Sequence, residues 1–160
     1  HWQTGKVIPE ELINKLENSG LFNQGFETTE FIAAAILDME YHKLQEIGDD
    51  FNVAEFEKAK MDEIGLIDEI YPRYRSTYYA HIFSGGYSAG YYVYYWAAVL
   101  DSDAFNYFKE SGDLFNPELA AKFRQHCLQE CGNDEGMVQY KKFRGQEPSN
   151  EPFLKKHGLK

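Results

Sequence analysis

The chain has 160 residues, a formal net charge of −10 and a hydrophobic fraction of 43%. This length allows one sizeable core, so we expect a single α-helical domain over residues 1–160. The acidic excess argues against a nucleic-acid partner, because phosphate binding needs a basic stripe and the 16 Lys and Arg form none. No apolar run reaches the roughly 18 residues of a membrane span, which predicts a soluble chain without a membrane partner.

Helix signals recur along the chain, and strand signals are scarce. Pro9 begins a short helix with acidic residues in its first turn. Thr28 or Thr29 is expected to cap a second helix that ends at Gly48. The expected helices cover residues 9–20, 28–48, 53–65, 87–112, 116–132, 134–145 and 150–158. The predicted fold class is therefore all-α, an irregular multi-helix arrangement with one long functional loop over residues 70–86.

The helix expected after this loop is unusually rich in tyrosine. At helical spacing, Tyr87, Tyr91 and Tyr94 share one stripe, and Tyr92 and Trp96 share another. The second stripe suits a packed core, whereas a row of phenols needs hydrogen-bond partners or water. Either the phenols wedge between helices with their hydroxyls at the rim, or they line a wet cleft.

Three residues ahead of the tyrosines favour the cleft. Gly85 and Gly86 allow positive φ, close approach of the backbone to a ligand and a hinge. His81 can donate to or accept from whatever lies over the phenols. A histidine and two phenols are hydrogen-bond donors suited to an oxyanion.

The segments HIFSGGYSAGYYVYYW, FNQGFETTEFIAAAILDMEYH and FRGQEPSNEPFLKKHGL together resemble a known family. They are similar to the C-terminal portion of the thimet oligopeptidase family of zinc metallopeptidases, peptidase family M3. The chain most resembles the bacterial peptidyl-dipeptidases and oligopeptidase A-like enzymes. The resemblance covers nearly the whole chain and implies the C-terminal subdomain of a zincin-type hydrolase that cleaves short peptides.

The resemblance also implies roles for individual residues. His81 would contact substrate near the scissile bond, and Tyr87 and Tyr94 would hold substrate and stabilise the tetrahedral intermediate. Tyr91 would be a further cleft tyrosine, and the glycine pair would belong to a mobile loop that closes over the peptide. The implied substrate-binding residues are His81, Gly85, Gly86, Tyr87, Tyr91 and Tyr94, of which Tyr94, Tyr87 and His81 are the implied catalytic residues.

The metal site of the family is missing from this sequence. Such enzymes bind zinc through HExxH on a helix, with the glutamate as general base and a later glutamate as third ligand. None of the five histidines here is followed by Glu. The resemblance therefore implies a C-terminal fragment whose partner is the zinc-binding part of the same polypeptide. It also implies that zinc is the cofactor of the full-length enzyme and that the fragment alone is inactive.

The remaining histidines and cysteines suggest no metal site of their own. Asp38, His42 and Glu46 share a helix face but form no recognisable ligand set, and a surface or capped histidine is favoured. Cys127 and Cys131 lie four residues apart without a second pair, so we expect reduced thiols. The prediction is that no metal is bound by ligands within this chain.

Two other classes of function stay open from the residues alone. A helical interaction module could bind a peptide in an aromatic groove without chemistry. In a purely structural domain, the phenols of Tyr87 and Tyr94 would be buried and paired. The quoted motifs fit both removal of C-terminal dipeptides and internal cleavage, and no export signal separates a cytoplasmic from a periplasmic location.

Overall fold

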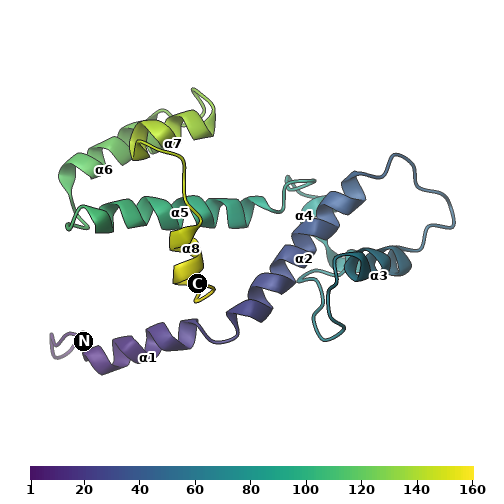
Figure 1. Cartoon of the computed structure of the whole chain (residues 1–160), viewed down its shortest axis with the longest axis horizontal. Helices are drawn as coiled ribbons and strands as arrows, with labels where there is room; N and C mark the ends of the chain where they lie inside the picture. The colour runs from purple at the N-terminus through teal and green to yellow at the C-terminus, as the bar shows by residue number, and fades with distance from the viewer. The chain divides into compact units, whose positions relative to one another are not determined.

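The computed structural model describes residues 1–160, and all of its regular elements are helical (Figure 1). The predicted all-α class is therefore confirmed. The chain packs as two compact units, His1–Val93 and Tyr94–Lys160. None of the helices combines the length and apolar composition needed to cross a lipid bilayer.

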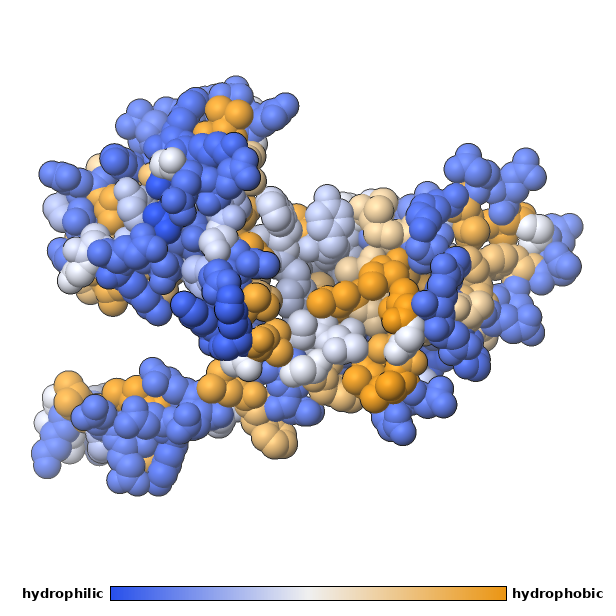
Figure 2. Space-filling model, viewed as in Figure 1, coloured by the Kyte–Doolittle hydropathy of each residue, from blue (hydrophilic) through white to orange (hydrophobic).

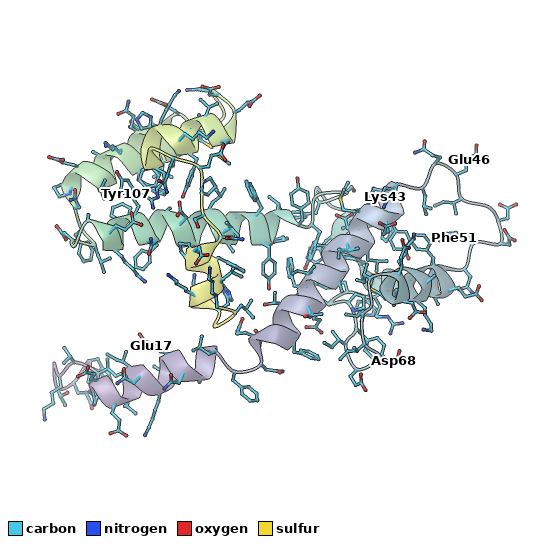
Figure 3. All side chains as sticks on the ribbon, viewed as in Figure 1. Glu17, Lys43, Glu46, Phe51, Asp68 and Tyr107 are labelled. Carbon is cyan, nitrogen blue, oxygen red and sulfur yellow. The ribbon has the colours of Figure 1, made fainter.

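The first unit is built on the long helix α2, which packs against α3. Its elements are α1 (Glu10–Gly20), α2 (Gln24–His42), α3 (Val53–Glu63), the 3₁₀ turn η1 (Ser76–Tyr78) and the short α4 (Ala80–Phe83). The buried core contains Ala33, Ala34, Ala35, Leu37, Tyr41, Met61, Tyr79, Ile82 and Tyr91. Phe51, labelled beside α3 in Figure 3, extends this core through Phe56, with ring centroids 5.3 Å apart. Small alanines on α2 thus leave room for aromatic rings from other segments.

Helix α1 contributes nothing to this core. All of its residues are exposed, and Leu12, Ile13 and Leu16 are among the exposed large apolar side chains. Figure 2 shows apolar surface along this helix. An amphipathic helix is stabilised mainly by burial of its apolar face, which here has no partner within the chain.

The ends of α2 differ from the prediction. The helix begins at Gln24, after Asn23 in the left-handed region (φ 60°), and Thr28 lies buried inside it rather than capping it. It ends at His42, because residues 45–50 are exposed and offer no apolar face to hold further turns against the core.

The second unit packs three short helices and a π-helical segment around α5. Its elements are α5 (Val93–Glu110, starting at the last residue of the first unit), α6 (Pro117–Phe123), η2 (Arg124–Gln129), α7 (Gly136–Arg144) and α8 (Glu151–Lys156). Buried Asp103 on α5 accepts hydrogen bonds from the Tyr140 hydroxyl at 2.6 Å and from Nε of Arg144 at 3.2 Å. Tyr107 is labelled on α5 in Figure 3, and the guanidinium carbon of Arg144 lies over its ring, 4.5 Å from the ring centroid.

The predicted helix over residues 116–132 is α-helical in α6 and π-helical in η2.

Candidate functional site

An aromatic cluster surrounds His81, which lies on the single turn of α4. The centroid of the His81 ring is 4.7 Å from that of Tyr74, 5.7 Å from Tyr91 and 6.2 Å from Tyr87. Tyr79 completes the group, with its ring centroid 5.2 Å from that of Tyr91. We call these five residues the His81 cluster. In the sequence, all five belong to the segment that connects α3 to α5. This one segment therefore folds back on itself to form the cluster.

Part of the His81 cluster is core, and part reaches the surface. Tyr79 and Tyr91 are 1% and 3% exposed, whereas Tyr87 is 37% exposed. The Tyr79 hydroxyl donates to the carbonyl oxygen of Ala34 at 3.1 Å, and Phe31 stacks on Tyr91 with ring centroids 4.8 Å apart. Burial raises the pKa of the Tyr79 phenol, so it stays protonated and keeps its hydrogen bond. The cluster therefore joins a fixed buried part to an accessible phenol.

His81 itself is half-buried, and its Nδ1 atom is buried without a hydrogen-bond partner in the protein. An imidazole carries at least one ring N–H. His81 can therefore donate a hydrogen bond to a ligand.

The turn between α4 and α5 places Tyr87 next to His81. A Cβ atom on Gly85 would lie 3.0 Å from the His81 carbonyl oxygen, so the missing side chain lets the two backbones approach. The Ser88 hydroxyl donates to the carbonyl oxygen of Ile82 at 2.6 Å and ties the turn to α4. The turn is therefore packed against the helix that carries His81.

The glycine pair does not use the positive φ that glycine allows. Neither Gly85 nor Gly86 lies in the left-handed region, whereas Ala89 does, with φ 52°. Gly85 is needed for close packing of backbone, and a Cβ on Gly86 would meet nothing within 4 Å.

The predicted stripe of three tyrosines on one helix was wrong. Because α5 begins at Val93, Tyr87 and Tyr91 lie in the turns that precede it. The directions of their side chains are therefore set by these turns and not by helical spacing. Tyr91 is buried, whereas Tyr94, the first residue of the second unit, is 42% exposed. The structure thus brings His81, Tyr87 and Tyr91 together within the first unit.

The second stripe, expected to pack in the core, is exposed. Tyr92 is 53% exposed and Trp96 is 46% exposed. The start of α5 at Val93 removes the helical register on which this prediction depended. Their large apolar rings remain on the surface of the chain.

Sequence reasoning missed the buried carboxylate that holds the turn. One oxygen of Asp38 accepts from the backbone N–H of Ala89 and the other from that of Tyr91, each at 2.9 Å. His42 lies 2.9 Å from the same carboxylate, while Glu46 lies beyond the end of α2. The spacing of Asp38 and His42 was visible in the sequence, but the partner amides lie about fifty residues away.

Tyr74 and Tyr79 were also missed as neighbours of His81. Both lie in the predicted functional loop over residues 70–86, which the structure shows to contain η1 and α4. Their aromatic density, in the segment YPRYRSTYYAH, was the available signal.

No group of three or more His, Cys, Asp or Glu side chains lies where it could hold a metal ion. His126 instead lies 3.1 Å from Oε2 of Glu130, and both cysteines are free thiols. Burial raises the pKa of the Cys127 thiol, and the neighbouring Cys131 adds to the shift.

The sequence pattern of Peptidase family M3 matches residues 1–159. The chain is 42% identical to the dipeptidyl carboxypeptidase of Escherichia coli K12 over 99% of its length, which covers 23% of that protein. It is 33% identical to oligopeptidase A of the same organism, over 100% of the chain and 23% of the relative. Saccharolysin of Saccharomyces cerevisiae is 32% identical, over 99% of the chain and 22% of the relative. The chain thus spans less than a quarter of these relatives, and it belongs to peptidase family M3.

Proposed function

We propose that the chain supplies substrate-binding and transition-state-stabilising groups to a zinc-dependent peptidase that hydrolyses short peptides. Family membership and the similarity to dipeptidyl carboxypeptidase and oligopeptidase A support this proposal. The observation that carries it is the His81 cluster, where a half-buried imidazole and a partly exposed phenol lie side by side on a buried aromatic support. A site of this kind combines apolar walls with a few placed donors.

The proposed chemistry of the chain is hydrogen-bond donation. When a peptide carbonyl becomes tetrahedral, its oxygen gains negative charge, and phenol O–H groups of Tyr87 and Tyr94 donate to it. His81 donates to the substrate backbone and holds the scissile bond in place. The segment of Gly85 and Gly86 closes over the bound peptide. These donors act most strongly in the transition state, which raises kcat.

The residues present do not fit a zinc site, as no suitable group of three ligands exists. We therefore propose that the metal is bound by a segment of the polypeptide outside these 160 residues, and that this segment is the chain's partner. The relatives, of which the chain covers 23%, have room for such a segment. The isolated chain is then expected to hydrolyse no peptide, and zinc-dependent cleavage by it would contradict the proposal.

The change Tyr94→Phe in the full-length protein tests the proposed role. Loss of one oxyanion donor, worth about 3 kcal/mol, lowers kcat by roughly 10²-fold with little change in KM. The neighbouring exposed phenol supplies the control, since Tyr92→Phe removes a hydroxyl with no assigned role. Steady-state kinetics on a short peptide give both constants.

An unchanged kcat in Tyr94→Phe would exclude this residue from the transition state. Peptide binding without turnover by the wild-type, metal-loaded protein would favour the peptide-binding module instead.

A further inference from the structure

We propose that Asp38 is a positioning residue that sets the geometry of the turn over residues 86–92 and thereby places Tyr87 beside His81. This inference rests on the proposed function for its effect on catalysis, but its structural part stands on contacts within the first unit. Asp38 belongs to α2, whereas the turn it binds lies 51 and 53 residues further along the chain. Its carboxylate binds two backbone amides of the turn, so it acts through the backbone.

The first step of the argument is the cost of burying this carboxylate. Asp38 is fully buried, and an ionised group in the interior is tolerated only when donors compensate it. The structure supplies two backbone N–H donors at 2.9 Å, from Ala89 and Tyr91, one for each oxygen. Both donors belong to the turn, so the carboxylate is satisfied only when the turn adopts this conformation.

His42 lies beside the same carboxylate. Its Nδ1 atom hydrogen-bonds with the backbone carbonyl oxygen of Asp38 at 2.8 Å and lies 2.9 Å from one carboxylate oxygen. Both of these atoms are acceptors, so Nδ1 carries the proton. The imidazole therefore lies against the carboxylate, while the two amides of the turn are its hydrogen-bond donors.

The turn itself needs such an anchor. Ala89 has φ 52°, in the left-handed region, which is strained for a residue with a Cβ. A charge-assisted hydrogen bond from the Ala89 amide to Asp38 is stronger than a neutral one and offsets this strain. Without it, the turn is expected to relax towards a conformation that alanine prefers.

The position of Tyr87 follows from the anchor. The backbone carbonyl oxygen of Tyr87 accepts from the N–H of Gly90 at 2.9 Å, which places Tyr87 at the start of the turn bound by Asp38. The next residue, Ser88, is tied to α4 through Ile82. The backbone of Tyr87 is therefore held by the turn, and its ring centroid lies 6.2 Å from that of His81. Misplacement of a catalytic donor by about 1 Å can cost roughly 10²-fold in rate.

Amide hydrogen exchange on the wild-type full-length protein tests the structural part. Ala89 and Tyr91 lie outside any helix, yet their amides are expected to exchange at least tenfold more slowly than the exposed amides of residues 45–50. In Asp38→Asn, the new NH₂ group faces one of the two N–H donors, so both amides are expected to exchange at least tenfold faster. Unprotected amides in the wild type would overturn the proposal whether or not the variant folds.

Peptidase kinetics test the functional part, with Asp103→Asn as the matched control. Asp103 is also fully buried and hydrogen-bonded, but its partners are Tyr140 and Arg144. Asp38→Asn is expected to lower kcat about 10- to 100-fold with KM within about threefold of wild type. Asp103→Asn is expected to lose thermal stability but keep kcat within about threefold.

The two arms separate the positioning role from the proposed function. An equal loss of kcat in both variants, or faster exchange throughout α2 in Asp38→Asn, would indicate general destabilisation and overturn the positioning role. If the wild-type protein shows no peptidase activity while the exchange results hold, the proposed function fails and the role of Asp38 in the turn stands.

Discussion

At the scale of single residues, the two adjacent glycines differ in what they do. A Cβ on Gly85 would lie 3.0 Å from the His81 carbonyl oxygen, whereas a Cβ on Gly86 would meet nothing within 4 Å. Because the contact of Gly85 is with backbone, it cannot be relieved by a side-chain rotation. Gly85 is therefore required for close packing of the backbone, whereas the packing around Gly86 would accept a side chain.

Gly85→Ala is expected to lower the free energy of unfolding by about 1 kcal/mol, the lower range for overpacking. Gly86→Ala is expected to leave it unchanged or raise it by up to about 1 kcal/mol, since alanine restricts the unfolded chain. Urea denaturation of both variants measures the difference. Equal destabilisation by the two changes would show that the approach of Gly85 to His81 is not as described.

The same scale shows what could be read from the sequence about the site. The neighbourhood of His81 and Tyr87 was predictable, because only five residues separate them. The burial of Tyr91 was not, because it depends on Phe31 and on the exact residue at which α5 begins. The role of Asp38 was not predictable either, because its carboxylate meets the N–H groups of Ala89 and Tyr91 only in the folded chain.

At the scale of helices, local signals located the elements well and their ends less well. The predicted helix at Asn116 and Pro117 was confirmed, and the Asn116 side chain accepts from the N–H groups of Glu118 and Leu119 at 3.0 and 3.1 Å. This cap needs only neighbouring residues. The start of α5 instead depends on a turn anchored by Asp38 from another helix, which no local pattern reveals.

Asn116→Ala is expected to destabilise the chain by about 1 kcal/mol, because two N–H groups at the start of α6 lose their acceptor. Asn150→Ala is the matched control. Asn150 precedes α8 but makes no capping hydrogen bond through its side chain. Thermal unfolding of the two variants compares them directly, and a larger loss for Asn150→Ala would contradict the assigned caps.

At the scale of the whole molecule, the sequence predicted the family and the helical class, both of which are confirmed. It did not predict that the chain packs as two units, because a boundary inside an aromatic stretch carries no break in composition. The large apolar side chains of α1 are exposed, and no group of three suitable metal ligands lies together.

The central claim is that phenols of this chain stabilise the tetrahedral state of a peptide bond. Binding of a phosphinic peptide, whose tetrahedral anionic group resembles that state, to the full-length protein tests it most directly. Tyr94→Phe is expected to weaken this binding by about 10²-fold, in step with its loss of kcat/KM, while binding of a product peptide changes less than about threefold. Equal weakening of both ligands, or no weakening of either, would contradict the claim.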